Sequence, residues 1–418
     1  MRDFLPQDKA LRERTVGIIR SVFSGHGFDE IETPVMEDSF RLHAGLGGDN
    51  EKLAFAVLKR GLTADDFRVA VDALDLADLG LRFDLTVPLA RFYATHRAEL
   101  PTVFRSIQAA PVWRAERPQK GRYRQFMQCD IDIIGEAGSL AEIELLTASG
   151  AALDALGITG WTIRINDRRL LTGMLEIFGF AQTEFETALI TIDKLDKVGH
   201  AGVIAELRSR SMTTSAVDSI EDFFRRQQTM ENFAFDEKSI LKALPQGMDD
   251  ALISGLAALG QAVQGAFPSR QLVEFDPFLV RGMGYYTGTI FEIVHPDLPY
   301  SLGGGGRYDG MIGRFLGTDV PAAGFSIGFE RILELVSLSS HESGGAVLIY
   351  DDDVNTVTLM GLKAALVANR RRVRLERVPR NLKPLLAQLA ASGFSEIATV
   401  STSTVSIDQL RFRKLIAD

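Results

Sequence analysis

Residues 113–132, WRAERPQKGRYRQFMQCDID, contain the clearest structural signal in the chain. They lie within two strand-forming runs, 103–116 and 123–135, separated by a segment with proline and glycine at 117–122. A short polar segment with these turn residues between two such runs predicts an antiparallel β-hairpin.

The second strand of this hairpin has two unlike faces, because side chains alternate along a strand. One face is apolar and is expected to face the core: Met127, Cys129, Ile131 and Ile133. The other carries one aromatic ring, an amide and two carboxylates: Phe126, Gln128, Asp130 and Asp132. Burying such groups without partners is costly, so this face predicts the floor of a polar pocket. An ordinary sheet edge with surface ion pairs is the alternative.

The first strand adds groups that suit a nucleotide. Arg114 and Glu116 share one of its faces. An arginine binds phosphate oxygens through charge-assisted hydrogen bonds, and Glu116 can accept a hydrogen bond from an adenine amino group. Phe126 can stack under the base.

Residues 81–88, LRFDLTVP, predict a further strand on which Arg82, Asp84 and Thr86 share a face. On that face Asp84 and Thr86 can hold an ammonium group. A half-exposed strand without a binding role is the alternative.

Two glycine-rich segments follow: 279–288, LVRGMGYYTG, and 303–310, GGGGRYDG. Four consecutive glycines weaken a strand but let a small ligand lie directly against the backbone. Arg281 and the tyrosine pair nearby favour a binding site over a flexible hairpin turn. Residues 324–333, GFSIGFERIL, predict a strand that runs into a helix with Arg331 in its first turn. Such an arginine suits a terminal phosphate, although a capping or surface role is the alternative.

The remaining sequence predicts an α+β protein with separate parts. Apolar residues at helical spacing predict helices at 8–24 and 139–156, and residues 186–255 predict a helical insertion. After a linker at 338–345, alternating strands and helices predict a small α/β domain over 345–418. The main domain then comprises 1–185 and 256–337.

The amino-acid composition indicates the cellular compartment of the protein and limits its classes of partner. Its 418 residues include a single cysteine, Cys129, which excludes an internal disulfide and favours a reducing, cytoplasmic compartment. No apolar run is long enough to predict a membrane span. The net charge of −9 argues against non-specific nucleic-acid binding. An arginine-rich run at 370–383 is a local basic exception, with a solvated helix end and strand as the alternative.

Together these segments resemble the histidyl-tRNA synthetases, which are class II aminoacyl-tRNA synthetases. Motif 1 is similar to the helix from Asp8 and the strand ending at Pro34, motif 2 to the hairpin, and motif 3 to 324–332. The two histidyl signatures are similar to 280–288 and 303–310. The resemblance runs in order over about 1–335, and implies an antiparallel catalytic sheet flanked by helices in a homodimer.

The resemblance also implies a role for individual residues in an ATP- and Mg²⁺-dependent activation of histidine, followed by transfer to tRNA(His). Arg114 and Arg281 would be catalytic, at the α-phosphate and the attacking carboxylate. One set would surround histidine: Asp84, Leu85, Thr86, Gln128, Asp132, Tyr285 and Tyr286. Another would hold ATP: Arg114, Glu116, Arg122, Phe126 and Arg331. No Mg²⁺ ligand is predicted, and the arginine-rich run would contact the anticodon arm.

Three departures from the family pattern leave other functions open. Gly284 stands where Asp often precedes the tyrosine pair, Met127 where a polar or aromatic residue is common, and the C-terminal domain is short. One alternative is a non-catalytic, synthetase-like regulatory subunit of ATP phosphoribosyltransferase. The other is a paralogue that activates histidine but delivers it to an acceptor other than tRNA.

Overall fold

The structure is a computed structural model that describes residues 1–43, 53–117, 121–227, 235–281, 284–338 and 344–415. Parts of the predicted turn at 117–122, of the linker at 338–345 and of the signature at 280–288 lie outside these residues. The chain divides into two compact units. The first comprises Met1 with Ile18–Val336, and the second Arg2–Gly17 with Ser337–Asp418.

An eight-stranded sheet forms the centre of the first unit, in the order β1-β5-β6-β11-β10-β9-β7-β8. Its strands from β5 to β7 are antiparallel to their neighbours, whereas β1 and β8 pair in parallel at the two edges. The bounds are β1 Asp29–Glu30, β5 Phe104–Trp113, β6 Gln125–Ile134, β7 Thr162–Asp167, β8 Val273–Phe275, β9 Thr289–Val294, β10 Gly303–Arg307 and β11 Ala322–Gly328.

The predicted hairpin is confirmed as β5 and β6, which pair antiparallel with Val112 opposite Phe126. The two faces of β6 also divide as the sequence predicts. Cys129, Ile131 and Ile133 are completely buried in the core, and Met127 is partly buried. This alternation positions the polar side chains of β6 on the opposite face.

Helices flank the large sheet. The long helix α6 (Leu140–Ala155) packs on β6 and β11, and α12 (Asp250–Gly265) packs on α6, β7 and β8. The other helices of the first unit near the sheet are α5 Thr86–His96, α7 Arg168–Phe178, α13 Asp309–Leu316 and α14 Phe329–Ile332, whereas α1 Pro6–Gly25 is divided between the two units at Gly17. Four more are α8 Phe185–Ile192, α9 Leu195–Ser209, α10 Thr214–Gln227 and α11 Glu237–Ala243, with the short turn η2 Gln182–Glu184 before them. The described parts of the predicted insertion, 186–255, are therefore helices joined by short turns, and α12 continues past the predicted end to Gly265.

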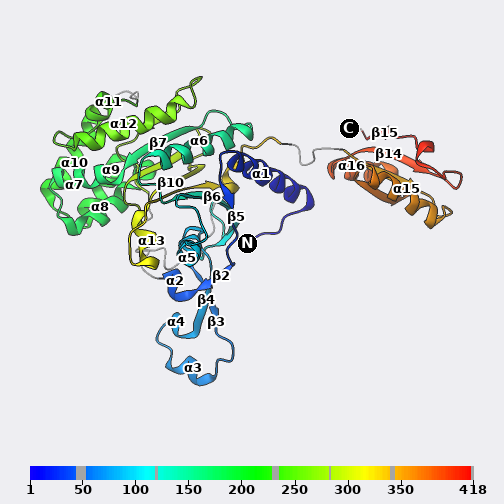
Figure 1. The fold of residues 1–418 in the computed structure, drawn as a ribbon, viewed down its shortest axis with the longest axis horizontal. Helices are drawn as coiled ribbons and strands as arrows, with labels where there is room; N and C mark the ends of the chain where they lie inside the picture. The colour runs from blue at the N-terminus through cyan, green and yellow to red at the C-terminus, as the bar shows by residue number, and fades with distance from the viewer. Residues whose placement is uncertain (44–52, 118–120, 228–234, 282–283, 339–343, 416–418) are drawn as a thin grey trace. The chain divides into compact units, whose positions relative to one another are not determined.

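A three-stranded sheet, in the order β2-β4-β3, forms a lobe of the first unit away from α8–α12 (Figure 1). Its elements are β2 Met36–Asp38, α2 Ser39–His43, β3 Phe55–Leu58, α3 Ala64–Val69, α4 Ala73–Leu76 and β4 Ala77–Leu81. Each of its two short helices, α3 and α4, begins with a capping box, built on Thr63 and Asp72.

The strand predicted at 81–88 is wrong. β4 ends at Leu81, and α5 begins at Thr86. The carboxylate of Asp84 accepts a hydrogen bond from the backbone N–H of Val87 at 3.1 Å, which satisfies a free donor at the start of the helix. Pro88 lies in the first turn, where its missing N–H costs no intrahelical bond. The alternation of apolar and polar residues thus comes from a buried loop that caps a helix.

The second unit contains a four-stranded sheet in the order β13-β12-β14-β15. The strands β12 (Gly345–Tyr350), β13 (Val373–Arg377) and β14 (Phe394–Val400) run parallel, with α15 (Thr356–Ala368) and α16 (Leu382–Ala391) between them in sequence. Apolar clusters lie on both sides of β12, around Leu348 and Val347. The turn η3 (Ile407–Gln409) and the antiparallel edge strand β15 (Arg413–Lys414) were not expected.

Several arginines of the 370–383 run contact this second unit itself. Arg371 pairs with Glu396, and Arg377 pairs with Asp352 at 2.9 Å. Arg372 lies over the Phe394 ring, 4.2 Å from its centroid. These contacts reduce the number of cations that face solvent without a partner. Within the described residues, no helix is long and apolar enough to cross a membrane.

Candidate active site

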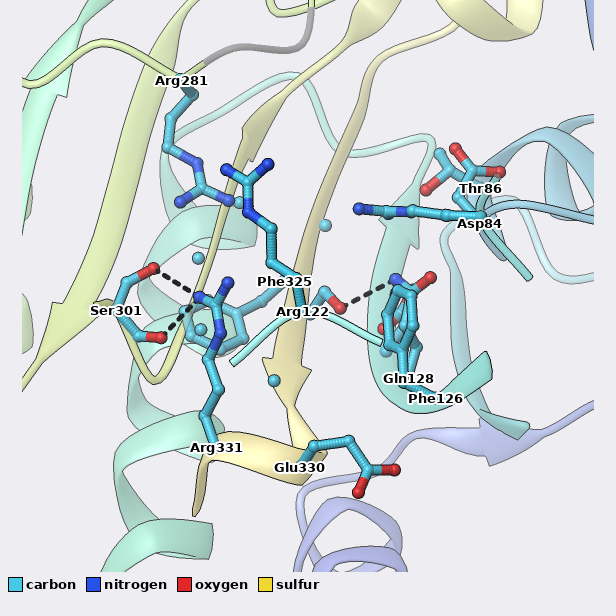
Figure 2. Close-up of a pocket in the computed structure, with 18 of the residues that line it drawn as sticks. Asp84, Thr86, Arg122, Phe126, Gln128, Arg281, Ser301, Phe325, Glu330 and Arg331 are labelled. Carbon is cyan, nitrogen blue, oxygen red and sulfur yellow. Dashed lines mark hydrogen bonds between the residues drawn. The ribbon is translucent and has the colours of Figure 1, made fainter. Parts of the chain in front are cut away.

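One pocket collects the predicted site residues from segments far apart in sequence. Its lining includes every one of them except Leu85: Asp84, Thr86, Arg114, Glu116, Arg122, Phe126, Gln128, Asp132, Arg281, Tyr285, Tyr286 and Arg331. Leu85 lies beside the pocket with its side chain completely buried, and its backbone oxygen accepts a hydrogen bond from Gln108 at 3.0 Å. Asp84 and Thr86 lie on one side, and Arg122, Arg281 and Arg331 on the other (Figure 2).

The floor of the pocket is acidic. Asp130 and Asp132 from β6 and Asp84 from the loop before α5 are each at most 4% exposed. Burial raises the pKa of Asp84 to about 6, against the opposing effects of the Val87 N–H and Arg114. Burial, together with the charge of Asp84, raises the pKa of Asp132 to about 7. Three carboxylates this close favour a cationic ligand, because a positive charge offsets the cost of their burial.

Two buried acceptor atoms of this floor have no hydrogen-bond partner among the residues that the structure describes: Asp84 Oδ2 and Gln128 Oε1. Buried polar atoms are almost always paired in folded proteins. Both residues line the pocket, so these atoms are available to a ligand that donates hydrogen bonds. An ammonium group has the required charge and donors.

A tyrosine cluster closes the pocket next to Asp132. The Tyr308 hydroxyl donates a hydrogen bond to Asp132 Oδ1 at 2.6 Å. Tyr285 contacts both Tyr286 and Tyr308, with ring centroids 4.8 and 6.0 Å apart. Sequence reasoning missed Tyr308, although it follows the glycine strand directly at the point where that strand enters the pocket. The cluster combines hydroxyl donors with a carboxylate around an aromatic-lined space, which suits an imidazole.

Arginines from four segments line the other part of the pocket, and neighbouring groups position three of them. Arg281 pairs with Glu292 at 3.0 Å, and its Nε atom is buried without a partner. Arg114 donates from Nε to the Phe83 carbonyl at 2.9 Å and lies over the Phe126 ring.

The third of these arginines, Arg331, donates to the Ser301 carbonyl at 2.8 Å (Figure 2). Its helix, α14, spans four residues only, so the helix dipole adds little and the guanidinium itself would attract an anion. Burial lowers the pKa of Arg331, and the charge of Arg281 acts in the same direction. A bound polyanion would relieve this mutual repulsion.

The four glycines at 303–306 form β10, a central strand paired on both sides with β9 and β11. The flexible-turn alternative is therefore wrong. A Cβ at position 305 would lie 1.8 Å from the Gly324 carbonyl oxygen, and one at 304 would lie 2.7 Å from Arg281 Nη1. Gly303, Gly304 and Gly305 line the pocket, so their bare backbone gives a ligand room directly on the sheet.

The pocket fits a magnesium ion carried in with nucleotide phosphates. Among the described residues, no group of three or more His, Cys, Asp or Glu side chains is arranged to hold a metal by itself. Mg²⁺ typically binds phosphate oxygens and waters with one or two carboxylates. Besides the three aspartates of the floor, Glu116 and Glu330 are the carboxylates in the lining of the pocket, so they are the candidates.

Comparison with known proteins decides the family. The model of a family described as "Histidyl-tRNA synthetase" matches residues 1–332. The chain belongs to the histidyl-tRNA synthetase family. A "Histidine--tRNA ligase" of Leifsonia xyli subsp. xyli is 58% identical over 97% of this chain and 95% of its own length. A "Probable histidine--tRNA ligase" of Tropheryma whipplei, strain Twist, is 43% identical over 94% and 93%.

Solved structures confirm the fold class. A histidyl-tRNA synthetase from Nostoc sp. PCC 7120 superposes with a TM-score of 0.76, covering 99% of this chain and 93% of that one at 25% identity. An "ATP phosphoribosyltransferase regulatory subunit/histidyl-tRNA synthetase" from Bacillus halodurans C has a TM-score of 0.75 at 18% identity, covering 97% of both chains. At that identity the second likeness shows the shared fold alone.

The two departures in the pocket region from the histidyl-tRNA synthetase pattern have local explanations. At Gly284 no side chain supports the tyrosine pair, but the Tyr285 ring packs against the rings of both Tyr286 and Tyr308. Met127 is on the partly buried face of β6, and its backbone N–H donates to Glu330 at 3.3 Å. Neither position places a group in the pocket that conflicts with the family's chemistry.

Proposed function

We propose that this chain activates histidine with ATP, giving histidyl-adenylate and pyrophosphate, and then transfers the histidyl group to the 3′ end of tRNA(His). The chain is a histidine–tRNA ligase. The observation that carries the proposal is the single pocket in which unpaired buried acceptors face several arginines, in a member of the histidyl-tRNA synthetase family.

The acidic part of the pocket would bind histidine. Asp84 Oδ2 and Gln128 Oε1 would accept hydrogen bonds from its ammonium group, with Thr86 next to them. Asp132, held by Tyr308, would face the imidazole together with the tyrosine pair. A site built from paired polar groups rejects analogues that lack them, because it would leave its own buried groups unsatisfied.

The arginines would bind ATP and stabilise the transition state. Phe126 would stack on adenine, Glu116 would accept from its amino group, and Arg122 and Arg331 would hold the outer phosphates. Attack of the histidine carboxylate on the α-phosphorus gathers negative charge on the phosphoryl oxygens. Arg114 and Arg281 would stabilise this charge from fixed positions. No general base is needed, since the attacking carboxylate is already ionised, and a phosphate-bound Mg²⁺ would neutralise the leaving pyrophosphate.

The second unit would contact tRNA. Several arginines of the 370–383 run are engaged within the unit, so the cations left for RNA are Arg370, Arg380 and Lys383. These three side chains are exposed or partly exposed. A few cations of this kind would position the anticodon arm through phosphate contacts without reading sequence. A tRNA substrate also places the reaction in the cytoplasm.

A homodimer fits the exposed apolar surface of the β2-β4-β3 lobe. Five large apolar side chains there are 48–93% exposed: Met36, Leu58, Phe67, Val69 and Val71. Exposed apolar side chains on this lobe are candidates for an interaction surface. Sedimentation equilibrium should give twice the chain mass of 45.9 kDa, and Phe67→Asp should shift the protein toward the monomer. A monomeric wild-type protein at micromolar concentration would overturn the dimer.

The two alternative functions, a regulatory subunit and a paralogue with another acceptor, would use the arginines of the pocket differently. A regulatory subunit has no use for a phosphate-binding set, and here Arg114, Arg281 and Arg331 all line the pocket. A paralogue with a non-tRNA acceptor would keep the first step but lose the second. Both alternatives therefore separate cleanly from the proposal in activity measurements.

ATP–pyrophosphate exchange with each of the twenty amino acids tests the first step. Exchange with histidine alone, dependent on Mg²⁺, is the expected result. Charging of tRNA(His) with radiolabelled histidine then tests the second step. If folded protein exchanged with no amino acid, the regulatory alternative would replace the proposal; exchange without charging would favour the other acceptor.

A further inference from the structure

We propose that Asp130 is a positioning residue that fixes the side-chain amide of Gln128, so that its oxygen faces the ammonium group of the ligand. This inference rests on the proposed function of the pocket. It assigns a purpose to the one carboxylate of the floor that the binding of histidine and ATP leaves without a role.

The contacts of Gln128 determine which end of its amide faces the pocket. Gln128 Nε2 donates to Asp130 Oδ2 at 3.1 Å and to Ser326 Oγ at 3.0 Å, the latter drawn in Figure 2. Both N–H donors of the amide are thereby used. The other end, Oε1, is buried and has no partner within the described part of the chain.

An ionised carboxylate can impose this orientation because it only accepts hydrogen bonds. The two ends of an amide have almost the same shape, so packing alone does not distinguish them. Beside Asp130 the NH₂ end is favoured, which leaves the carbonyl oxygen for the ligand. The reversed amide would direct two N–H donors at an ammonium group that can only donate.

A purely structural role for Asp130 is hard to reconcile with its surroundings. The side chain is 4% exposed, and among the described residues it has no ion pair with a lysine or arginine. It faces Gln108 on β5 and Ser326 on β11, where uncharged side chains would pair more cheaply. Burial and the neighbouring Asp132 raise the pKa of Asp130, so ionising it costs free energy. A positively charged ammonium group bound nearby would stabilise the ionised carboxylate. Ionisation of Asp130 is therefore favoured when the ligand is bound.

A double-mutant cycle tests whether Asp130 acts through Gln128. The variants are Asp130→Asn, Gln128→Ala and the double variant, and each is assayed for the KM of histidine in ATP–pyrophosphate exchange. Asparagine keeps the shape of Asp130 but offers both donors and acceptors, so the amide is no longer fixed. We expect Asp130→Asn to raise the KM for histidine about tenfold in the wild-type background and less than about twofold in the Gln128→Ala background.

A ligand without the ammonium group supplies the second readout. Imidazolepropionate should inhibit exchange in competition with histidine, and its inhibition constant should change less than about twofold with Asp130→Asn. The KM for ATP should stay the same. Equal factors in both backgrounds, or an equal loss for both ligands, would overturn the proposal and leave Asp130 with a direct or structural role. Absence of exchange in the wild-type enzyme would instead refute the proposed function.

Discussion

At the scale of single residues, Arg281 gives the sharpest test of the chemistry. Its guanidinium is aligned by Glu292 at 3.0 Å and has a buried Nε that is unpaired among the described residues. A lysine keeps the charge but loses the fork of donors. We expect Arg281→Lys to lower kcat of exchange about 10²–10³-fold with little change in the KM for histidine, measured by steady-state kinetics.

A matched control for Arg281 is Arg164→Lys. Arg164 lies opposite Glu292 in the register of β7 and β9 and pairs with Asp196 and Asp276, outside the pocket. Its substitution should leave kcat within about twofold, because Arg164 does not line the pocket and lysine keeps its positive charge. If both variants lost activity equally, the charge network rather than the transition state would explain the effect.

Asp84 predicts a pH dependence of histidine binding. Burial raises the pKa of Asp84 to about 6, so the carboxyl group is protonated below that pH and cannot pair with an ammonium. The KM for histidine of the wild-type enzyme should therefore fall as the pH rises from 5 to 8. Asp84→Asn removes this ionisation. The ratio of the two KM values should be small at pH 5 and rise to about tenfold or more at pH 8.

Taking this ratio cancels the titration of the histidine imidazole, which occurs in the same pH range but affects both enzymes alike. The same exchange assay, run in buffers of constant ionic strength, measures it. A ratio that does not vary with pH would show that Asp84 does not meet the ammonium as a carboxylate.

At the scale of elements, β10 depends on having no side chains. A Cβ at position 305 would lie 1.8 Å from a backbone oxygen of β11, a clash that no rotamer change relieves. We expect Gly305→Ala to lower the free energy of unfolding by several kcal/mol or prevent folding. Gly310→Ala is the control, since no atom lies within 4 Å of its Cβ position. Urea denaturation followed by circular dichroism compares them, and equal stabilities would contradict the packing argument.

The elements also show what the sequence could and could not predict. The β5–β6 hairpin was predictable because strand alternation and turn residues agree over a long run. The segment at 81–88 alternates equally well, yet it is a loop followed by α5, because the Asp84 cap and Pro88 favour a helix start. The local pattern could not reveal this; only the burial of Asp84 between distant segments does.

The residues of the site also divide into those that the sequence could predict and those that it could not. Gln128 and Asp132 could be assigned to the pocket because β6 presents them on one face, and Arg114 because it directly follows the other strand of the same hairpin. Tyr308 was missed because its role depends on the pairing of β10 with β11, which brings it to Asp132. Similarly, the glycine run suggested a turn or a bare surface, and only the sheet order shows that it is a central strand.

At the scale of the whole molecule, the buried carboxylates of the acidic floor favour ligand binding but lower the stability of the folded protein. Burial raises the pKa of Asp84, Asp130 and Asp132, and the charge of Arg114 opposes this rise only in part, at Asp84 and Asp130. Burying these carboxylates lowers the free energy of unfolding, and a bound cationic ligand raises it. Histidine should therefore stabilise the protein against heat more at pH 8 than at pH 5.

Asp132 allows this cost to be measured. Burial raises its pKa to about 7 in the folded protein, whereas an unfolded aspartate titrates near 4. Between these values the folded state binds the extra proton, so the stabilisation is fully present at pH 4 and is lost as the pH rises through 7. We expect Asp132→Asn to gain on the order of 2–4 kcal/mol of unfolding free energy, relative to wild type, between pH 4.5 and pH 8. Asp297→Asn, at an exposed position, should show no such gain in the same urea titrations. A stability difference between Asp132→Asn and wild type that stays constant with pH would mean that Asp132 is already ionised at low pH in the folded protein, and that the floor has a positive partner before histidine binds.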